Sequence, residues 1–384
     1  MKMKKEEDVL AELIEKRKKC AFFSDGRILS SVYSKPTDIS LKAFSIFHDV
    51  NALDTYLFPE IEAMEKEVIE WLSKLYKAKR GDGYITSGGT ESNIVALWVA
   101  KKLYPKRKEV IAPRSVHYSI DKACDLLSLK LIKTPLDENF KADISYIKKR
   151  ISRRTLAIVL TAGTSSLGVI DPIEAANDIC DDIYFHVDAA FSGFVIPFLK
   201  RKKIKLSFEL ENLDSIAVDP HKMGLSPIPS GAIIFRDESY LERVAFEASY
   251  LPSKAKKTKT LLGSRPGGSI AAIWANIKLL GINGYQNIVE KCISNTKYLI
   301  KKLNAIDALE LVIKEPEINF IAIKLSKNQK KFKNIEELQR ELERRNFLAS
   351  VDKETSSLRI VIMPHITKDV IDSFIAALES IFKK

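Results

Sequence analysis

A lysine that could act as a nucleophile stands in the motif Asp219-Pro220-His221-Lys222. The motif follows the apolar run 215–218, which predicts a strand, and Pro220 ends that strand because it has no N–H to donate to a sheet ladder. Lys222 would then lie at the edge of a sheet, where a lysine can lose its proton and form an imine with a carbonyl compound. Taken alone, Lys222 is better explained as an ordinary surface lysine.

An aspartate with a possible electrostatic role stands upstream, in His186-Val187-Asp188-Ala189-Ala190. It ends a predicted strand at 183–187, and open parallel sheets bind their ligands at the carboxyl ends of strands. Asp188 could hold a cation or a protonated ring nitrogen there, while a flat ring lies against Ala190. Capping of the next helix by Asp188 is the alternative.

The segment Thr86-Ser87-Gly88-Gly89-Thr90-Glu91-Ser92-Asn93 could bind an anion. It follows a predicted strand and opens a helix that ends near Tyr104. Glycines let the backbone approach a ligand closely, and the free N–H groups at a helix N-terminus favour a phosphate. A plain turn with a helix cap is the alternative. The glycine spacing and the missing lysine exclude the nucleotide P-loop and the dinucleotide fingerprint.

Together, the three motifs describe one site for a phosphorylated aromatic aldehyde, and the cofactor they imply is pyridoxal 5′-phosphate. His117 begins a helix after the next strand and could stack on the ring face opposite Ala190, although local packing would also explain it. No pair among the five histidines has the i, i+4 spacing of a helical metal site, so no metal is expected.

The elements that must position these residues predict an α/β fold. Short apolar runs separated by helical patterns indicate a mostly parallel, seven-stranded sheet flanked by helices, followed by a smaller α+β C-terminal domain. The predicted strands are 84–86, 110–112, 129–132, 156–160, 183–187, 215–218, the antiparallel run 231–235, and then 308–313, 318–325, 347–351 and 358–363. The predicted helices outside the sheet region are 5–19, 38–49, 268–303 with a break near Gly281 to Gly284, 334–345 and 367–382.

The expected domain limits are 1–49 for an N-terminal helical segment, 50–270 for the large domain and 271–384 for the small one. The segment 1–49 cannot bury itself and should pack on the small domain or on a second subunit. The stretch 252–260, with its lysines and proline, is the best candidate for a mobile loop.

Length and composition fit a large globular protein. The 384 residues are 46% hydrophobic and 29% charged, which excludes disordered and low-complexity classes. No apolar run approaches the roughly 18 residues of a membrane span, and four widely separated cysteines suit a reducing cytoplasm. The formal charge of +12 raises nucleic acid as a possible partner, but most lysines alternate with Glu and Asp.

The order and spacing of these motifs resemble the fold-type I pyridoxal-phosphate enzymes, in the group II amino-acid decarboxylase branch. The resemblance covers nearly the whole chain and is nearest to the archaeal L-tyrosine/L-aspartate decarboxylases. The segments that carry it are Ser34-Lys35-Pro36, Thr86 to Asn93, His117, Gly163-Thr164-Ser165, His186 to Ala190, Asp219 to Lys222, Leu261 to Arg265 and Leu358 to Val361.

The resemblance implies a role for each matching residue. Gly89 and Thr90 would bind the phosphate, with His221 beside it, and His117 would stack on the ring. Thr164 or Ser165 would touch the ring edge, Asp188 would pair with the ring nitrogen and Lys222 would form the Schiff base. Arg359 would bind the substrate carboxylate, and Tyr250 is a candidate proton donor to the substrate carbon. An obligate homodimer with shared active sites is also implied, with Ser264 and Arg265 in a turn suited to a phosphate across the interface.

The predicted reaction is decarboxylation of an L-amino acid, either L-aspartate to β-alanine for coenzyme A or L-tyrosine to tyramine for methanofuran. The charge of +12 favours aspartate weakly, and the sequence does not decide between aspartate, tyrosine and glutamate. A carbon–carbon lyase of the sphingosine-phosphate lyase type is the nearest alternative, because Gly263 to Gly267 resembles that branch too. A basic RNA-binding or RNA-modifying protein is the alternative from another class; it is weakened because the basic runs at 200–203 and 254–257 lack interleaved aromatics.

Overall fold

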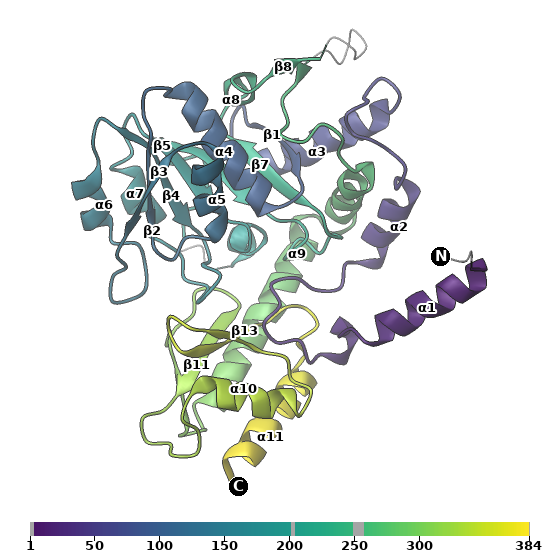
Figure 1. The fold of residues 1–384 in the computed structure, drawn as a ribbon, viewed down its shortest axis with the longest axis vertical. Helices are drawn as coiled ribbons and strands as arrows, with labels where there is room; N and C mark the ends of the chain where they lie inside the picture. The colour runs from purple at the N-terminus through teal and green to yellow at the C-terminus, as the bar shows by residue number, and fades with distance from the viewer. Residues whose placement is uncertain (1–3, 201–203, 249–256, 384) are drawn as a thin grey trace.

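A seven-stranded sheet forms the centre of the larger part of the molecule (Figure 1). The computed structural model describes residues 4–200, 204–248 and 257–383. Its strands are β1 (Asp82–Thr86), β2 (Glu109–Pro113), β3 (Lys130–Thr134), β4 (Thr155–Thr161), β5 (Tyr184–Asp188), β6 (Leu213–Val218) and β7 (Gly231–Phe235). The strand order is β1-β7-β6-β5-β4-β2-β3. All seven strands coincide with predicted runs, which confirms the expected fold class.

One strand departs from the parallel pattern. β7 pairs antiparallel with both β6 and β1, whereas the neighbours from β3 to β6 run parallel. The predicted antiparallel run therefore lies inside the sheet. As a result, the segment Thr86 to Asn93, named the phosphate-binding segment for its predicted role, follows β1 beside the loop that joins β6 to β7.

Successive residues of the strands face two separate layers of helices. On β4, Ala157 and Val159 pack in the core under α4 (Gly89–Leu103) and α5 (Tyr118–Leu126), whereas Ile158 and Leu160 pack in the core with α3 (Pro59–Leu75) and α7 (Ile173–Asn177). Burial on both faces explains why these strands are almost wholly apolar in sequence. The shorter helices are α6 (Ile144–Arg150), α8 (Ser239–Glu242) and the 3₁₀ turns Phe23–Asp25, Ser192–Phe194 and Ile196–Phe198.

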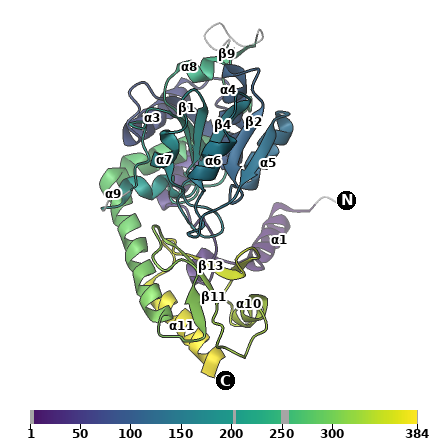
Figure 2. The same ribbon diagram turned by 90° about the vertical axis from the view of Figure 1, so that its left-hand side faces the viewer.

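Helix α9 (Gly267–Leu303) runs beside the large sheet and continues to a second, four-stranded antiparallel sheet (Figure 2). It breaks at Gly281, whose φ of 52° and ψ of −163° lie outside the helical region, at the predicted place. The second sheet has the order β10-β11-β13-β12. Its elements are β10 (Leu309–Leu311), β11 (Phe320–Leu325), β12 (Ser350–Asp352), β13 (Ser357–Val361), α10 (Ile335–Glu343) and α11 (Lys368–Lys383).

The strand predicted at 347–351 begins later than expected, because Leu348 instead forms a bridge with Ile28 of the N-terminal segment. This segment contains α1 (Glu6–Lys18) and α2 (Asp38–Ile46), close to the predicted limits. α2 packs on α9, and the Thr37 side chain contacts the buried Asn276 of α9. α1 has no buried residue and stands apart from the body in both views (Figures 1 and 2).

The two sheets meet close to the carboxyl ends of the large sheet's strands. Gly168 has a φ of +68°, and a β-carbon there would lie 2.3 Å from the β-carbon of Phe320 in β11. Phe320 in turn meets Phe191 edge to face, with ring centroids 6.1 Å apart. The predicted mobile loop 252–260 falls largely outside the described residues; β8 (Phe246–Glu247) and β9 (Lys257–Thr258) pair on either side of residues 249–256.

Candidate active site

The phosphate-binding segment forms a tight link between β1 and α4. Gly88 has a φ of +151°, a conformation that L-residues with side chains rarely adopt, and Gly89 begins the helix. A β-carbon on Gly89 would approach the Ala190 methyl group to 3.1 Å and Asp219 Oδ2 to 3.2 Å. The first N–H groups of α4, which have no partner within the helix, therefore open directly onto the ends of β5 and β6.

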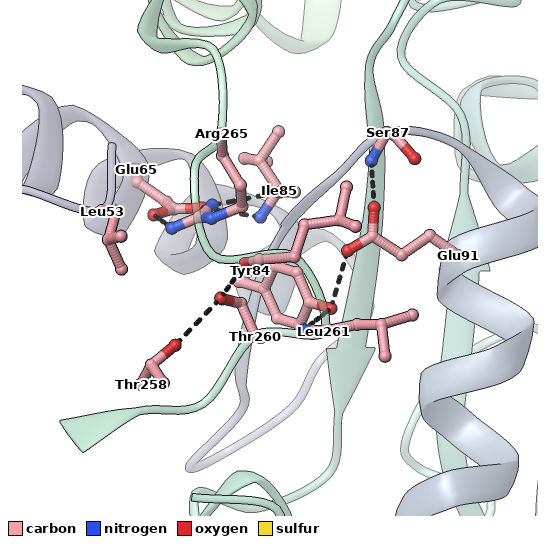
Figure 3. A network of polar contacts seen from close by, with 12 residues as sticks. Leu53, Glu65, Tyr84, Ile85, Ser87, Glu91, Thr258, Thr260, Leu261 and Arg265 are labelled. Carbon is pink, nitrogen blue, oxygen red and sulfur yellow. Dashed lines mark hydrogen bonds and ion pairs between the residues drawn. The ribbon is translucent and has the colours of Figure 1, made fainter. Parts of the chain in front are cut away.

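Two carboxylates, one buried and one partly buried, hold the backbone on which this segment rests (Figure 3). Glu91 accepts from the backbone N–H of Ser87 at 2.7 Å and from the Tyr84 hydroxyl at 3.0 Å. Glu65 accepts from the backbone N–H of Ile85 at 2.7 Å and is paired with Arg265. These bonds fix the strand end, so the helix N-terminus is preformed.

Asp188, the last residue of β5, is 4% exposed, and each of its carboxylate oxygens accepts one hydrogen bond. Its Oδ1 accepts from the backbone N–H of Ala190 at 3.0 Å, and its Oδ2 accepts from the Asn93 amide at 2.8 Å. The carboxylate is thus held at a strand end without a cationic partner of its own among the described residues.

Lys222 lies in the turn after β6. Its Nζ is 3.0 Å from Asp219 Oδ2, and the other oxygen of that buried carboxylate has no hydrogen-bond partner among the described residues. His221 Nδ1 accepts from the backbone N–H of Ser230 at 3.3 Å, while its Cε1 lies 3.1 Å from the position a β-carbon on Gly88 would take. His221 therefore stands beside the phosphate-binding segment.

His117 is the N-cap of α5, where its Nδ1 accepts from the backbone N–H of Ser119 at 3.3 Å. The Ser119 hydroxyl lies 2.9 Å from the same nitrogen. Burial lowers the pKa of His117, and this effect outweighs the opposing charge of Asp188. A neutral imidazole with its proton on Nε2 follows, which suits stacking on a flat ring.

A cavity of about 270 Å³ brings most of the predicted site residues together. Its lining consists of Ser87, Gly88, Gly89, Thr90, His117, Thr161, Gly163, Ser165, Asp188, Ala190, Phe191, Asp219, His221 and Lys222. Segments that are far apart in the sequence meet here because each follows a strand whose carboxyl end lies at the same edge of the sheet.

Three predicted residues do not line the cavity, and a fourth lies outside the described residues. Thr164 is buried and its hydroxyl accepts from the backbone N–H of Val169, so of the two candidates only Ser165 faces the cavity. Ser264 accepts from the Asn51 amide at 3.2 Å. Arg359 lies on β13 in the small sheet, and Tyr250 falls outside the described residues.

The predicted role of Arg265 at a subunit interface does not agree with its surroundings. Its guanidinium is buried and donates to Glu65 Oε2 at 3.0 Å and to the carbonyl of Ile85 at 3.1 Å within the same chain (Figure 3). Attraction to Glu65 raises the pKa of Arg265 despite the cost of burial. Arg265 therefore supports the strand before the phosphate-binding segment.

Sequence reasoning assigned no role to Asn93, Asp219 or Thr161. Asn93 joins the Asp188 carboxylate to α4, and Asp219 pairs with Lys222. Asp219 stands three residues before Lys222 in the quoted motif, and Asn93 stands in the glycine-rich segment, so both lay within reach of the sequence argument. Thr161 at the end of β4 had no motif to mark it.

The residues present fit pyridoxal phosphate. Asp219 Oδ1 and Thr161 Oγ1 are buried polar atoms with no partner in the described structure, and both residues line the cavity. The cavity also offers a helix N-terminus for a phosphate, a carboxylate for a ring nitrogen and a lysine for an aldehyde.

The family is decided by comparison with known proteins. Residues 48–326 match the pyridoxal-dependent decarboxylase conserved domain. The chain belongs to this family. It is 38% identical over its full length to the probable L-tyrosine/L-aspartate decarboxylase of Methanosphaera stadtmanae, covering 99% of that protein. It is also 38% identical to the L-aspartate/L-glutamate decarboxylase of Pyrococcus horikoshii, with 98% of this chain and 97% of the relative covered. The protein is a pyridoxal-phosphate-dependent amino-acid decarboxylase.

Solved structures support the fold of this decarboxylase. Glutamate decarboxylase of Lactobacillus brevis superimposes with a TM-score of 0.90 at 20% identity, over 100% of this chain and 93% of that one. Sphingosine-1-phosphate lyase of Burkholderia pseudomallei gives the same TM-score at 24% identity, over 100% of this chain and 91% of that one. These likenesses concern the fold alone, and the much closer decarboxylase relatives leave the lyase alternative less supported.

Two features of the described residues bear on other functions. Within residues 4–200, 204–248 and 257–383, no group of three or more His, Cys, Asp or Glu side chains is arranged to hold a metal ion. No described helix of the decarboxylase combines the length and apolar composition needed to cross a membrane.

Proposed function

We propose that this decarboxylase converts L-aspartate to β-alanine and carbon dioxide. The observation that carries the proposal is the similarity, over nearly the whole chain, to the two relatives described above, whose names both include aspartate.

In this proposal the cofactor supplies the electron sink for the bond that breaks between the substrate Cα and its carboxylate. Lys222 would hold the cofactor aldehyde, and Asp188 would accept a hydrogen bond from the ring nitrogen. His117 and Ala190 would contact the ring, and Ser165 would contact its edge. Gly89 and Thr90 would bind the phosphate through backbone N–H groups, beside His221.

Arg359 is proposed to bind the substrate α-carboxylate. Its guanidinium lies over the Phe320 ring at 5.5 Å, and Phe320 touches Phe191 of the cavity lining. The Nε of Arg359 is buried without a partner in the described part of the chain, and Nη1 makes one long bond, 3.4 Å, to Ser350. A guanidinium with unused donors this close to the cavity is suited to a carboxylate.

Tyr250 is proposed to return a proton to the substrate Cα after carbon dioxide leaves. The paired strands β8 and β9 flank the segment that contains it. Lys259, which follows this segment, offers less attraction for aspartate than the sequence suggests, because it is paired with Glu242. Similarity to relatives named for aspartate is therefore a better argument for this substrate than the net charge.

We also propose a cytoplasmic homodimer in an archaeal cell, in which β-alanine feeds coenzyme A biosynthesis. α1 supports the dimer, because Val9, Leu10, Leu13 and Ile14 are all more than 40% exposed and have no core to pack on in the single chain. Such a face on a helix is costly to leave in water.

Ser264 is proposed to reach the partner's cofactor phosphate, since its hydroxyl proton is not used by Asn51.

The test is to measure kcat/KM for L-aspartate, L-glutamate and L-tyrosine with the loaded enzyme at low and moderate salt. Aspartate should be preferred at both, with a modest loss at higher salt because long-range attraction is screened. A tyrosine value more than tenfold above that of aspartate under both conditions would refute the aspartate assignment. Tyrosine is the second candidate because the Methanosphaera relative carries it in its name.

A further inference from the structure

Behind the cavity, a row of buried polar side chains ends on Asp188. Asn93 on α4 is fully buried, and its Nδ2 donates to Asp188 Oδ2 at 2.8 Å and to Ser119 Oγ at 2.8 Å. Its Oδ1 lies 2.9 Å from His186 Nε2. The amide therefore uses both donors and its acceptor in a place that water does not reach.

The hydrogen bonds of this row have one consistent direction. The Asp188 carboxylate only accepts, so the Asn93 amide must turn its NH₂ toward it and its oxygen toward His186. His186 then carries its proton on Nε2, and its Nδ1, 2.8 Å from Ser215 Oγ, accepts. The Tyr184 hydroxyl donates to Ser215 Oγ at 2.8 Å, which leaves the Ser215 proton for His186.

His186 is neutral in this position. Complete burial lowers its pKa to about 4, against the opposing effect of the Asp188 charge. A neutral imidazole orients the Asn93 amide without adding a positive charge that would compete for Asp188. The negative charge of Asp188 thus remains free for a cation on the cavity side.

We propose that Asn93 and His186 are positioning residues that hold the Asp188 carboxylate in the orientation that accepts the N–H of the cofactor ring, so that the proton stays on the pyridine nitrogen. The Asn93 amide fixes one carboxylate oxygen, and His186 fixes that amide. Without Asn93, the carboxylate would lose the donor that orients it, and its hydrogen bond to the ring nitrogen would weaken. The proposal rests on the cofactor assignment and holds for any amino-acid substrate.

Asn93 and His186 could instead serve only to satisfy polar groups in the core. The variants must therefore separate this structural role from the positioning role. Asn93→Leu removes the donor to Asp188 at similar volume. His186→Phe leaves the Asn93 oxygen without a donor, whereas a glutamine in His186→Gln can still donate to Asn93 and accept from Ser215. Asn295→Leu is the matched control, because Asn295 is a buried amide on α9 that donates to the Ile366 carbonyl outside the cavity lining.

Each protein is loaded with pyridoxal phosphate labelled with ¹⁵N in the ring. The measurements are the ring-nitrogen chemical shift across a pH series and the cofactor dissociation constant. Asn93→Leu should weaken cofactor binding by about tenfold and shift the nitrogen signal toward neutral pyridine. His186→Phe should act in the same direction, His186→Gln should stay near the parent enzyme, and Asn295→Leu should lose stability only.

A parent-like nitrogen shift in both Asn93→Leu and His186→Phe would overturn the proposal, as would an equal shift in Asn295→Leu. If Asn93→Leu does not fold, the contrast between His186→Phe and His186→Gln decides alone. A parent enzyme that binds the cofactor but releases carbon dioxide from no amino acid would reject the proposed function, while the comparison of nitrogen shifts would still stand.

Discussion

At the scale of single residues, Lys222 and Asp219 form the pair on which the proposed chemistry depends. The amine is 3.0 Å from a carboxylate that is almost fully buried. Lys222 therefore has two roles to separate, as the proposed attachment point of the cofactor and as the counter-ion of Asp219. The sequence alone suggested only the first.

The two roles of Lys222 can be separated by comparing Lys222→Ala with Lys222→Arg. Both variants should lose turnover by roughly a thousandfold or more, because neither can bind the aldehyde. Lys222→Ala should also lose about 3 kcal/mol of unfolding free energy without cofactor, because it leaves a buried carboxylate unpaired, whereas Lys222→Arg keeps the charge. Urea denaturation of the cofactor-free proteins and borohydride reduction of the loaded parent enzyme provide the measurements. A borohydride adduct on another lysine would remove Lys222 from its role.

His186 should make the stability of the protein depend on pH. The pKa is about 4 when folded and ordinarily 6.5, so below pH 6.5 the unfolded chain binds a proton that the folded one does not. Stability contributed by neutral His186 is thus complete above pH 6.5 and falls by roughly 2–3 kcal/mol as the pH drops to about 4. The facing groups are Asp188 and Tyr184 on the same strand, Asn93 on α4 and Ser215 on β6.

Urea denaturation between pH 4 and 7 should therefore show a steeper loss of stability in the parent protein than in His186→Gln. All other ionisable groups are the same in the two proteins, so the difference between the two curves reports on His186. Parallel curves would contradict the assignment of a depressed pKa to His186.

One physical reason explains why the sequence could identify most of the site residues. Asp188, His117 and Lys222 each follow an apolar strand, and the carboxyl ends of parallel strands converge at one edge. The sequence shows Asn93 in the glycine-rich segment but not its role, because that role depends on hydrogen bonds to Asp188 and His186 on another element. Thr164 and Ser165 could not be separated, because which of two neighbours faces a cavity depends on the turn made by the loop around Gly163.

At the scale of elements, strand positions could be predicted from burial on both faces, but strand order could not. Nothing in the run 231–235 shows that β7 inserts between β1 and β6. Which strands pair depends on contacts between segments that are far apart in the sequence. The late start of β12 has the same origin: Leu348 is apolar enough for a strand but pairs with Ile28. The kink of α9 was predictable, because glycine is the residue that tolerates its geometry.

That kink gives a prediction for α9. Gly281→Ala should cost about 1–3 kcal/mol of unfolding free energy, because a φ of 52° with a ψ of −163° is strained for any residue with a β-carbon. No neighbouring atom lies within 4 Å of that β-carbon, so the loss would come from the backbone alone. Asn283→Ala, exposed in the next turn, should be neutral or slightly stabilising and serves as the control. Equal thermal denaturation of both variants and the parent would contradict a strained kink.

At the scale of the whole molecule, ion pairs weaken the argument that the charge of +12 indicates a nucleic-acid partner. Lys200, which begins one of the basic runs, pairs with Glu290, and Lys259 beside the other run pairs with Glu242. These contacts are surface pairs of small energy, but they reduce the local positive potential that an RNA-binding face requires. The exposed apolar face of α1 is the stronger indication of a macromolecular partner, which we propose to be a second copy of this chain.

The dimer can be tested on α1 without touching the cavity. Leu10→Lys combined with Leu13→Lys places two charges on the apolar face and should convert the protein to monomers, because burying unpaired charges in an interface is costly. Glu6→Gln combined with Glu7→Gln adds the same charge on exposed positions and should leave the assembly intact. Sedimentation velocity at several concentrations gives the mass of each. If α1 packs on the partner as proposed, the first variant should also lose activity. A fully active monomeric parent would refute the shared sites; a Leu10/Leu13 variant that remains dimeric would instead move the interface away from α1.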